Sequence, residues 1–274
     1  MRVAALQMRS TTDVEANIKA FEALVRDAAA QGASYIQTPE MTGIVEKNRK
    51  ALSAAICTQN DDPLFAHASA LAAELGVHIH IGSTAIKLDN GMVANRAAVF
   101  ASDGSLSAIY DKIHMFDVDL DKGESWRESA IYAPGDTLGM VEVGDTKIGL
   151  AICYDVRFPP LFRDQALAGA HILTVPAAFT RQTGQAHWHV LLRARAIENG
   201  AFVIAAAQGG RHEDGRETYG HSLIIDPWGR IISEKADDEP GVIFADIDLA
   251  EVAAARGKVP NLKNARPYNK KNHD

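Results

Sequence analysis

Along this chain, segments with the apolar spacing of β-strands alternate with segments that have the apolar spacing of α-helices. Arg2–Met8 predicts a strand, and Asp13–Gln31 predicts a helix because its apolar residues recur at helical spacing. Further strands are predicted over Ser34–Glu40, Val77–Ile86, Lys147–Cys153, His171–Ala178, Phe202–Gln208, Ser222–Glu234 and Gly241–Asp248, and further helices over Pro63–Leu75, Arg157–Ala168 and His187–Asn199. Strands that alternate with helices over the whole length predict an α/β fold with one or two mixed sheets.

The pattern indicates a single domain over residues 1–274. No linker, repeat or low-complexity segment interrupts it. After about Lys258 the chain is rich in Asn, Lys and Pro, which predicts an irregular C-terminal tail on the surface or on a partner subunit.

Composition narrows the class of protein. Apolar residues make up 47% of the 274 positions, enough to bury a large core, and the formal net charge is −7. This acidic balance argues against a nucleic-acid or membrane-surface binder, which would need a basic face. Two cysteines without a C-x-x-C pair argue against a disulfide framework, so we expect a cytoplasmic protein.

Three reactive side chains follow predicted strands. Glu40 ends SYIQTPE, Lys112 ends SAIYDK, and Cys153 ends KIGLAIC. In open α/β sheets, ligands collect beyond the carboxyl ends of the strands. Taken singly, the cysteine could fill the core and the two charged residues could lie in solvent. Together they predict a site.

The chemistry of these residue types suits acyl transfer at a carbon–nitrogen bond. A thiol needs a base, because the thiolate is the nucleophile. No histidine is an obvious partner, whereas a buried glutamate could accept the thiol proton and return it to a leaving amine. A lysine ammonium could stabilise the developing oxyanion.

The blocks YIQTPEM, YDKIHMFDVD, WRES and GLAICYDVRFPPL resemble, in this order, the signature blocks of the nitrilase superfamily of carbon–nitrogen hydrolases. The resemblance implies a four-layer α-β-β-α sandwich. It implies that Glu40 is the general base, Lys112 the oxyanion stabiliser and Cys153 the nucleophile. It also assigns the second glutamate of the family to Glu128 and an oxyanion-binding backbone N–H to Tyr154.

The region after Cys153 resembles the deaminated glutathione amidase branch of that superfamily, most closely in AAAQGGRH and YGHS. Tyr154 stands where nitrile-hydrolysing members usually carry tryptophan, which favours an amide substrate. The resemblance implies hydrolysis of deaminated glutathione to 2-oxoglutarate and cysteinylglycine. Two alternatives stay open: an ω-amidase acting on 2-oxoglutaramate or 2-oxosuccinamate, and an N-carbamoyl amino acid hydrolase.

A substrate with several carboxylates needs cationic or hydrogen-bond donor groups in its pocket. Two predicted loops offer Arg181, Thr183, Arg211 and His212, although each could instead be a surface residue or a cap. The segment His212–Glu217 adds acidic residues beside this proposed anion-binding loop.

We expect no metal and no cofactor. His78 and His80 share a strand face without an evident third ligand, and His187 and His189 diverge on a helix. The glycines near Gly209 lack the dinucleotide-binding spacing. The expected partners are a small-molecule amide and, by the family resemblance, a second copy of the chain in a homodimer or higher homo-oligomer. A non-catalytic binding module or a thiol-redox protein would be the rival classes.

Overall fold

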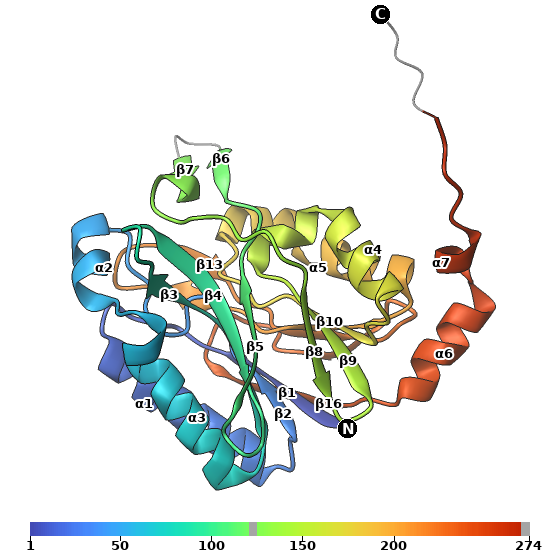
Figure 1. Ribbon diagram of the computed structural model, residues 1–274, viewed down its shortest axis with the longest axis horizontal. Coiled ribbons are helices and arrows are strands. Elements are labelled where there is room, and N and C mark those ends of the chain that lie inside the picture. Colours follow the sequence, from blue (N-terminus) through green and yellow to red (C-terminus); the bar gives the residue numbers. More distant parts are fainter. Residues whose placement is uncertain (121–124, 270–274) are drawn as a thin grey trace, which may run out of the picture.

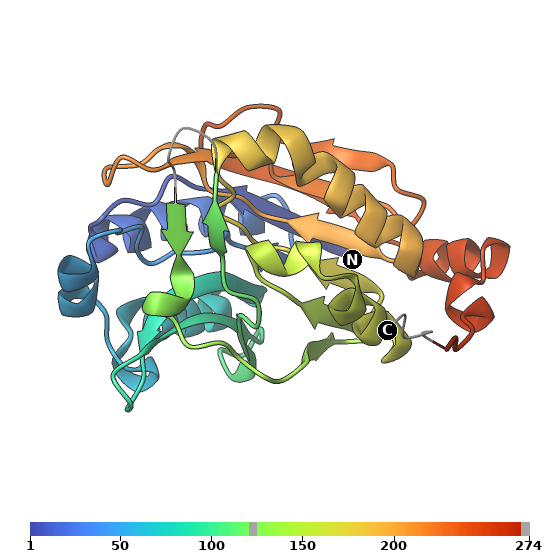
Figure 2. The ribbon, with the colours of Figure 1, turned by 90° about the horizontal axis from the view of Figure 1, so that it is seen from above.

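The computed structural model describes residues 1–120 and 125–269, which form two stacked six-stranded sheets (Figures 1 and 2). The first sheet has the order β16-β1-β2-β3-β4-β5, with strands Gly241–Asp246, Arg2–Gln7, Tyr35–Gln37, His78–Lys87, Val93–Phe100 and Leu106–Asp111. The second has the order β15-β14-β11-β10-β9-β8, with strands Ile231–Glu234, Leu223–Ile225, Phe202–Ala205, Ile172–Thr174, Thr146–Leu150 and Gly139–Val143.

Helices cover the outer face of each sheet. α1 (Val14–Ala30) and α3 (Pro63–Leu75) pack on the first sheet, and α4 (Pro159–Leu167) and α5 (Arg181–Asn199) on the second (Figure 1). The fold is therefore the expected α-β-β-α sandwich. No helix in the described ranges is long and apolar enough to cross a membrane.

The first strand shows how the layers are built. Val3 and Ala5 of β1 face the core between the two sheets, whereas Ala4 and Leu6 face the core under α1 and α3. Successive side chains of a strand point to opposite faces, so a central strand of a covered sheet must be apolar throughout. This explains why Val3, Ala4, Ala5 and Leu6 are all apolar.

Strand direction places the carboxyl ends of two strands of the first sheet on the same side. β2 is parallel to β1 and β3, and two antiparallel steps through β4 give β5 the direction of β3. The carboxyl ends of β2 and β5 therefore lie at the same side of the first sheet. In the second sheet, β9 is parallel to β10, which is parallel to β11.

Several helices begin or end at capping residues that can be recognised in the sequence. The Asp13 side chain accepts hydrogen bonds from the backbone N–H groups of Glu15 and Ala16 at the start of α1. α3 and α5 end at Gly76 and Gly200, both in the left-handed conformation that glycine adopts without strain.

One predicted helix start is wrong, and a second is refined. α5 begins at Arg181, six residues before the predicted start, because the Thr180 side chain caps the Thr183 N–H. Arg181 and Thr183 thus lie in the first helical turn and not in a loop. The helix predicted over Arg157–Ala168 is observed as α4 from Pro159, because a 3-10 turn over Cys153–Arg157 precedes it.

The C-terminal region is only partly irregular. α6 (Leu249–Lys258) is followed by the short α7 (Asn261–Asn264), which the sequence did not suggest. Arg256 donates to the carbonyls of Asn199 and Ala170, which fixes α6 beside the end of α5. Residues 265–269 have no regular structure and extend from the body in Figure 1.

Candidate active site

Glu40, Lys112 and Cys153 meet between the two sheets, although they are far apart in sequence. Each follows the carboxyl end of a strand, β2, β5 and β9 respectively. Lys112 Nζ lies 3.0 Å from Glu40 Oε1, and the Cys153 thiol is an electrostatic neighbour of both groups. All three side chains are buried.

The Lys112 ammonium lies between two carboxylates. Besides Glu40, it contacts both oxygens of Glu128 at 3.0 and 2.8 Å, while its side chain is only 2% exposed. Glu128 begins a short turn (Glu128–Ala130) and also accepts the Phe116 N–H at 2.6 Å. Glu128 therefore holds Lys112 together with Glu40.

Asn95 completes this set, and the sequence analysis missed it. Its side-chain amide donates to Glu40 Oε1 at 2.9 Å and to Glu128 Oε1 at 3.1 Å. The Ala178 N–H donates to the other oxygen of Glu40. A buried carboxylate needs such donors to stay ionised. An asparagine within β4 carries no sequence signal of this role.

Cys153 lies on a sharp turn at the head of a 3-10 segment. Its φ is +50°, a conformation that is unfavourable for a residue with a Cβ. Asp155, fully buried, accepts hydrogen bonds from Ile152 N, Tyr110 Oη and both His114 N and His114 Nδ1. These bonds hold the turn in its strained form.

The protonation states follow from burial and charge. Burial raises the pKa of the Cys153 thiol well above its usual value, and the neighbouring Glu40 carboxylate raises it further. Burial also opposes ionisation of Glu40, but the Lys112 ammonium and hydrogen bonds from Cys153, Lys112 and Asn95 leave its pKa lowered. The two glutamates raise the pKa of Lys112 despite burial. At neutral pH the set is a thiol, a carboxylate and an ammonium.

An open cavity of about 1070 Å³ lies in front of these groups. Glu40, Lys112, Cys153 and Tyr154 form its floor, together with Glu128. Its walls carry apolar side chains and several charged ones; these include Met41, Ile44, Leu52, Phe116, Trp126, Tyr132, Phe179, Lys47, Arg127, Arg181, Arg216 and Glu217. The volume admits a substrate much larger than a simple amide or nitrile.

The four predicted substrate residues divide into two pairs. Arg181 and Thr183 line the cavity, but Arg181 is ion-paired with Asp238 at 2.6 Å, and the Thr183 hydroxyl is hydrogen-bonded to Thr180. Arg211 and His212 are not among the residues that line it.

The reason lies in the hairpin of β12 (Gly209–Arg211) and β13 (Glu217–Tyr219). Arg211 is exposed on β12. The buried His212 side chain contacts the Ser10 carbonyl and the Thr218 hydroxyl, at 2.7 and 2.8 Å. The structure thus places neither residue at the cavity, which the hairpin reaches through Gly215–Glu217 instead.

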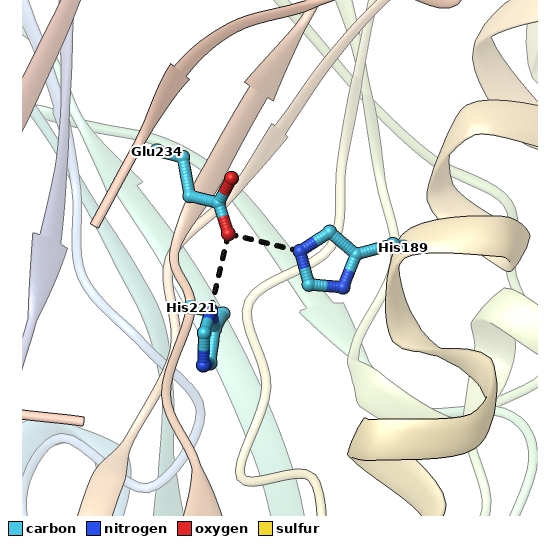
Figure 3. A group of neighbouring side chains, drawn as sticks. All are labelled: His189, His221 and Glu234. Carbon is cyan, nitrogen blue, oxygen red and sulfur yellow. Dashed lines mark hydrogen bonds and ion pairs between the residues drawn. The ribbon is translucent and has the colours of Figure 1, made fainter. Parts of the chain in front are cut away.

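A separate cluster joins His189 of α5, His221 and Glu234 of β15 (Figure 3). His189 Nε2 and His221 Nδ1 lie 2.9 and 3.1 Å from the same carboxylate oxygen. The candidate ligand atoms lie within 4.8 Å of one another, near what a metal ion requires. Hydrogen bonds from two imidazole N–H groups to one carboxylate account for the geometry without an ion. The sequence pattern gave His189 no partner, whereas the fold brings His221 and Glu234 to it.

Known proteins resemble this chain over nearly its whole length. The carbon–nitrogen hydrolase family matches residues 2–257. The deaminated glutathione amidase of Yersinia enterocolitica is 37% identical over 96% of this chain and 92% of the relative, and that of Mus musculus is 40% identical over 97% and 83%.

Solved structures agree with these sequence relatives. The NitFhit protein of C. elegans superposes with a TM-score of 0.89 at 33% identity, over 97% of this chain and 65% of that longer chain. Saccharomyces cerevisiae Nit3, a member of branch 10 of the nitrilase superfamily, has a TM-score of 0.85 at 25% identity, over 95% and 94%.

Proposed function

This chain belongs to the carbon–nitrogen hydrolase family of the nitrilase superfamily, and from that premise we propose that it hydrolyses deaminated glutathione to 2-oxoglutarate and cysteinylglycine. The observation that carries the proposal is the buried set of Glu40, Lys112 and Cys153 at the base of a wide cavity. The substrate follows from the relatives with that name. A binding module would have no need to bury two carboxylates and an ammonium around a thiol, because burying charges is costly.

Acylation begins at the thiol. Glu40 takes the proton of Cys153 as the sulfur attacks the amide carbon, so no free thiolate accumulates. The oxygen of the tetrahedral intermediate is stabilised by the Lys112 ammonium and by the backbone N–H of Tyr154. Protonated Glu40 then gives its proton to the leaving amine, the carbon–nitrogen bond breaks, and a thioester to Cys153 remains.

Deacylation repeats the cycle with water. Glu40 takes a proton from the water that attacks the thioester carbonyl, and the carbon–sulfur bond breaks with return of that proton to the sulfur. The products are the amine and the carboxylic acid, and the protein is regenerated. Glu128 and Asn95 are positioning residues in this scheme, since they hold Lys112 and Glu40.

The test of the substrate is a comparison of kcat/KM for four compounds: deaminated glutathione, 2-oxoglutaramate, an N-carbamoyl amino acid and a simple nitrile. The proposal predicts the highest value for deaminated glutathione. A higher value for 2-oxoglutaramate would identify an ω-amidase, and a higher value for the carbamoyl compound would identify a carbamoyl hydrolase. Absence of turnover with all four would reject the amidase mechanism.

The proposal extends to the setting of the protein. We propose that it acts as a single catalytic domain without a cofactor, in the cytoplasm, as a homodimer. The dimer is supported by large apolar side chains on the outer surface of the second layer, which include Val190 and Ile197 of α5 and Trp228 of the β14–β15 turn; each is more than half exposed. A cytoplasmic setting is supported by the absence of a C-x-x-C pair.

A further inference from the structure

One positive charge on the cavity wall, that of Arg216, has only a loose ion pair, with Asp214. Arg216, in the turn between β12 and β13, has a side chain that is 16% exposed. Its Nε is shielded from solvent and makes no hydrogen bond with any residue in the described ranges. Its nearest acidic atom is Asp214 Oδ2, at 3.6 Å from Nη2, which exceeds hydrogen-bond distance. A buried guanidinium N–H without an acceptor is costly unless a ligand supplies one.

The other cations of the wall are either occupied or exposed. Arg127 makes two hydrogen bonds to Asp119, at 2.8 and 2.9 Å, and Arg181 makes an ion pair with Asp238. Lys47 is exposed. Arg181 Nε likewise makes no hydrogen bond, but the Arg181 side chain is 41% exposed and is ion-paired with both Glu217 and Asp238. Among these described cations of the outer wall, Arg216 therefore combines a mostly buried side chain with an unused donor.

The side chain is held in place by its surroundings. The guanidinium carbon of Arg216 lies 4.8 Å from the centroid of the Trp126 ring, a cation–π contact. The turn itself is closed by two hydrogen bonds between the backbones of His212 and Arg216 and of His212 and Gly215. The buried His212 then fixes the turn to Ser10. A donor that is fixed before binding loses little conformational entropy on binding.

A line of aromatic contacts connects this position with the nucleophile. Tyr154, directly after Cys153, contacts Phe116 with 5.1 Å between ring centroids, and Phe116 contacts Trp126 at 6.3 Å. All three rings line the same cavity as Arg216. A substrate that lies along this wall would have its reacting carbonyl at Cys153 and another part at Arg216.

We propose that Arg216 binds a carboxylate of the substrate and sets the preference for carboxylate-bearing amides. The inference rests on the proposed function, since it assumes that such amides are the substrates. The planar guanidinium fork matches a carboxylate, and a charge-assisted hydrogen bond in a shielded position is stronger than an exposed one. The carboxylate belongs either to the acyl part or to the leaving group.

The test compares Arg216→Ala with wild type on three substrates. Deaminated glutathione carries both carboxylates, 2-oxoglutaramate carries only that of the acyl part, and butyramide carries none. We expect kcat/KM for deaminated glutathione to fall roughly ten- to hundredfold, with butyramide nearly unchanged. A parallel loss with 2-oxoglutaramate assigns Arg216 to the acyl carboxylate, and no loss there assigns it to the leaving group.

Matched variants separate recognition from folding. Arg211→Ala removes an exposed arginine of the same hairpin and should leave all three rates unchanged. If Arg216→Ala does not fold because Asp214 loses its neighbouring charge, the double variant Arg216→Gln, Asp214→Asn removes both charges and should show the same selective loss. Arg216→Lys keeps the charge without the fork and should recover only part of the activity.

Two results would overturn the inference, and they differ from failure of the proposed function. If wild type prefers the carboxylate-bearing amides and Arg216→Ala keeps that preference, Arg216 does not read the carboxylate. Equal losses on all three substrates would mean that it supports the fold or the catalytic set. If wild type itself shows no preference, the proposed function fails, and the inference fails with it.

Discussion

At the scale of single residues, the proposed role of Glu40 as general base would account for a buried thiol that reacts without a histidine. Because its pKa is lowered, it is ionised across the neutral range, whereas the Cys153 thiol stays protonated. In the proposed mechanism the proton therefore moves as the sulfur attacks and not in a prior equilibrium. The free protein in this mechanism thus carries a thiol beside a carboxylate and not a stable thiolate.

This predicts the pH dependence of kcat/KM. Glu40 acts as a base only above its own pKa, which lies below the usual glutamate value of about 4.3. Activity should therefore persist from neutral pH down to about pH 5 and fall only below the usual glutamate range. Initial rates in a constant-ionic-strength buffer series, with circular dichroism as a control for unfolding, measure it. An acidic limb between pH 6 and 7 would contradict the assignment of Glu40 as base.

Asn95 gives a second residue-scale prediction. Its amide bridges the carboxylates of Glu40 and Glu128, and a hydrogen bond to a charged group contributes about 1.5–3 kcal/mol. Asn95→Ala should lower kcat roughly ten- to hundredfold with a small change in KM, because Asn95 does not line the cavity. Asn95→Asp should be worse, since it places a third carboxylate beside two others. A change confined to KM would show that Asn95 contacts substrate instead.

At the scale of elements, the turn over Cys153–Arg157 positions the side chain of Cys153, the proposed nucleophile. Four hydrogen bonds to the Asp155 carboxylate hold this turn. One comes from the Ile152 N–H, one from Tyr110 of β5, and two from His114 in the segment after Lys112. The same carboxylate thus ties the thiol to the chain segment that carries the ammonium. A change at Asp155 should therefore displace both the Cys153 turn and the segment that follows Lys112.

Asp155→Asn should therefore reduce both stability and activity. One amide oxygen cannot replace two ionised oxygens as acceptors, so we expect a loss of about 3 kcal/mol in the free energy of unfolding. Urea denaturation measures that loss, and Asp164→Asn on the exposed side of α4 is the control with no expected effect. Unchanged stability and activity in Asp155→Asn would show that the turn does not depend on this carboxylate.

The sequence predicts elements well where capping and periodicity agree. α3 was predicted over Pro63–Leu75 and is observed there, between the cap Asp62 and Gly76. The start of α5 was missed because its first turn, Arg181–Gly184, is polar and contains a glycine, so no apolar period marks it. Its cap depends on Thr180, one of many threonines in the chain.

In the candidate site, too, some residues could be predicted from the sequence pattern and others could not. Glu40, Lys112 and Cys153 follow apolar strands, so their common position could be inferred from the pattern. Arg216 could not, because the register of the short β12–β13 hairpin decides which arginine faces the cavity. Arg211 pairs with Glu217 in that hairpin and is exposed, whereas Arg216 lies in the turn against Trp126. Contacts between distant segments decide the role of each arginine.

At the scale of the whole molecule, α5 has two different faces. Trp188 and Leu192 are buried against the second sheet, whereas Val190 and Ile197 are exposed. The positions of Val190 and Ile197 differ by seven residues, so both lie on one face. Exposed apolar residues gathered on one helix are typical of an interface between subunits.

The proposed dimer predicts a change in mass on substitution. Light scattering at micromolar concentration should give about twice the 29.5 kDa of one chain for the wild type. The pair Val190→Asp and Ile197→Asp should give the monomer mass, because two charges cannot be buried without partners. Leu106→Asp, at an exposed apolar position of β5 in the other sheet, is the control that should stay dimeric. A wild type at the mass of one chain would reject the dimer.

The central claim is that Cys153 forms a covalent intermediate during amide hydrolysis. The most direct measurement is the release of 2-oxoglutarate from deaminated glutathione by wild type and by Cys153→Ala, with melting temperatures compared to establish that both are folded. The claim predicts turnover by the wild type and none by Cys153→Ala, since removal of the nucleophile leaves Glu40 and Lys112 nothing to activate. A folded Cys153→Ala protein that retained more than a few per cent of the wild-type rate would contradict it.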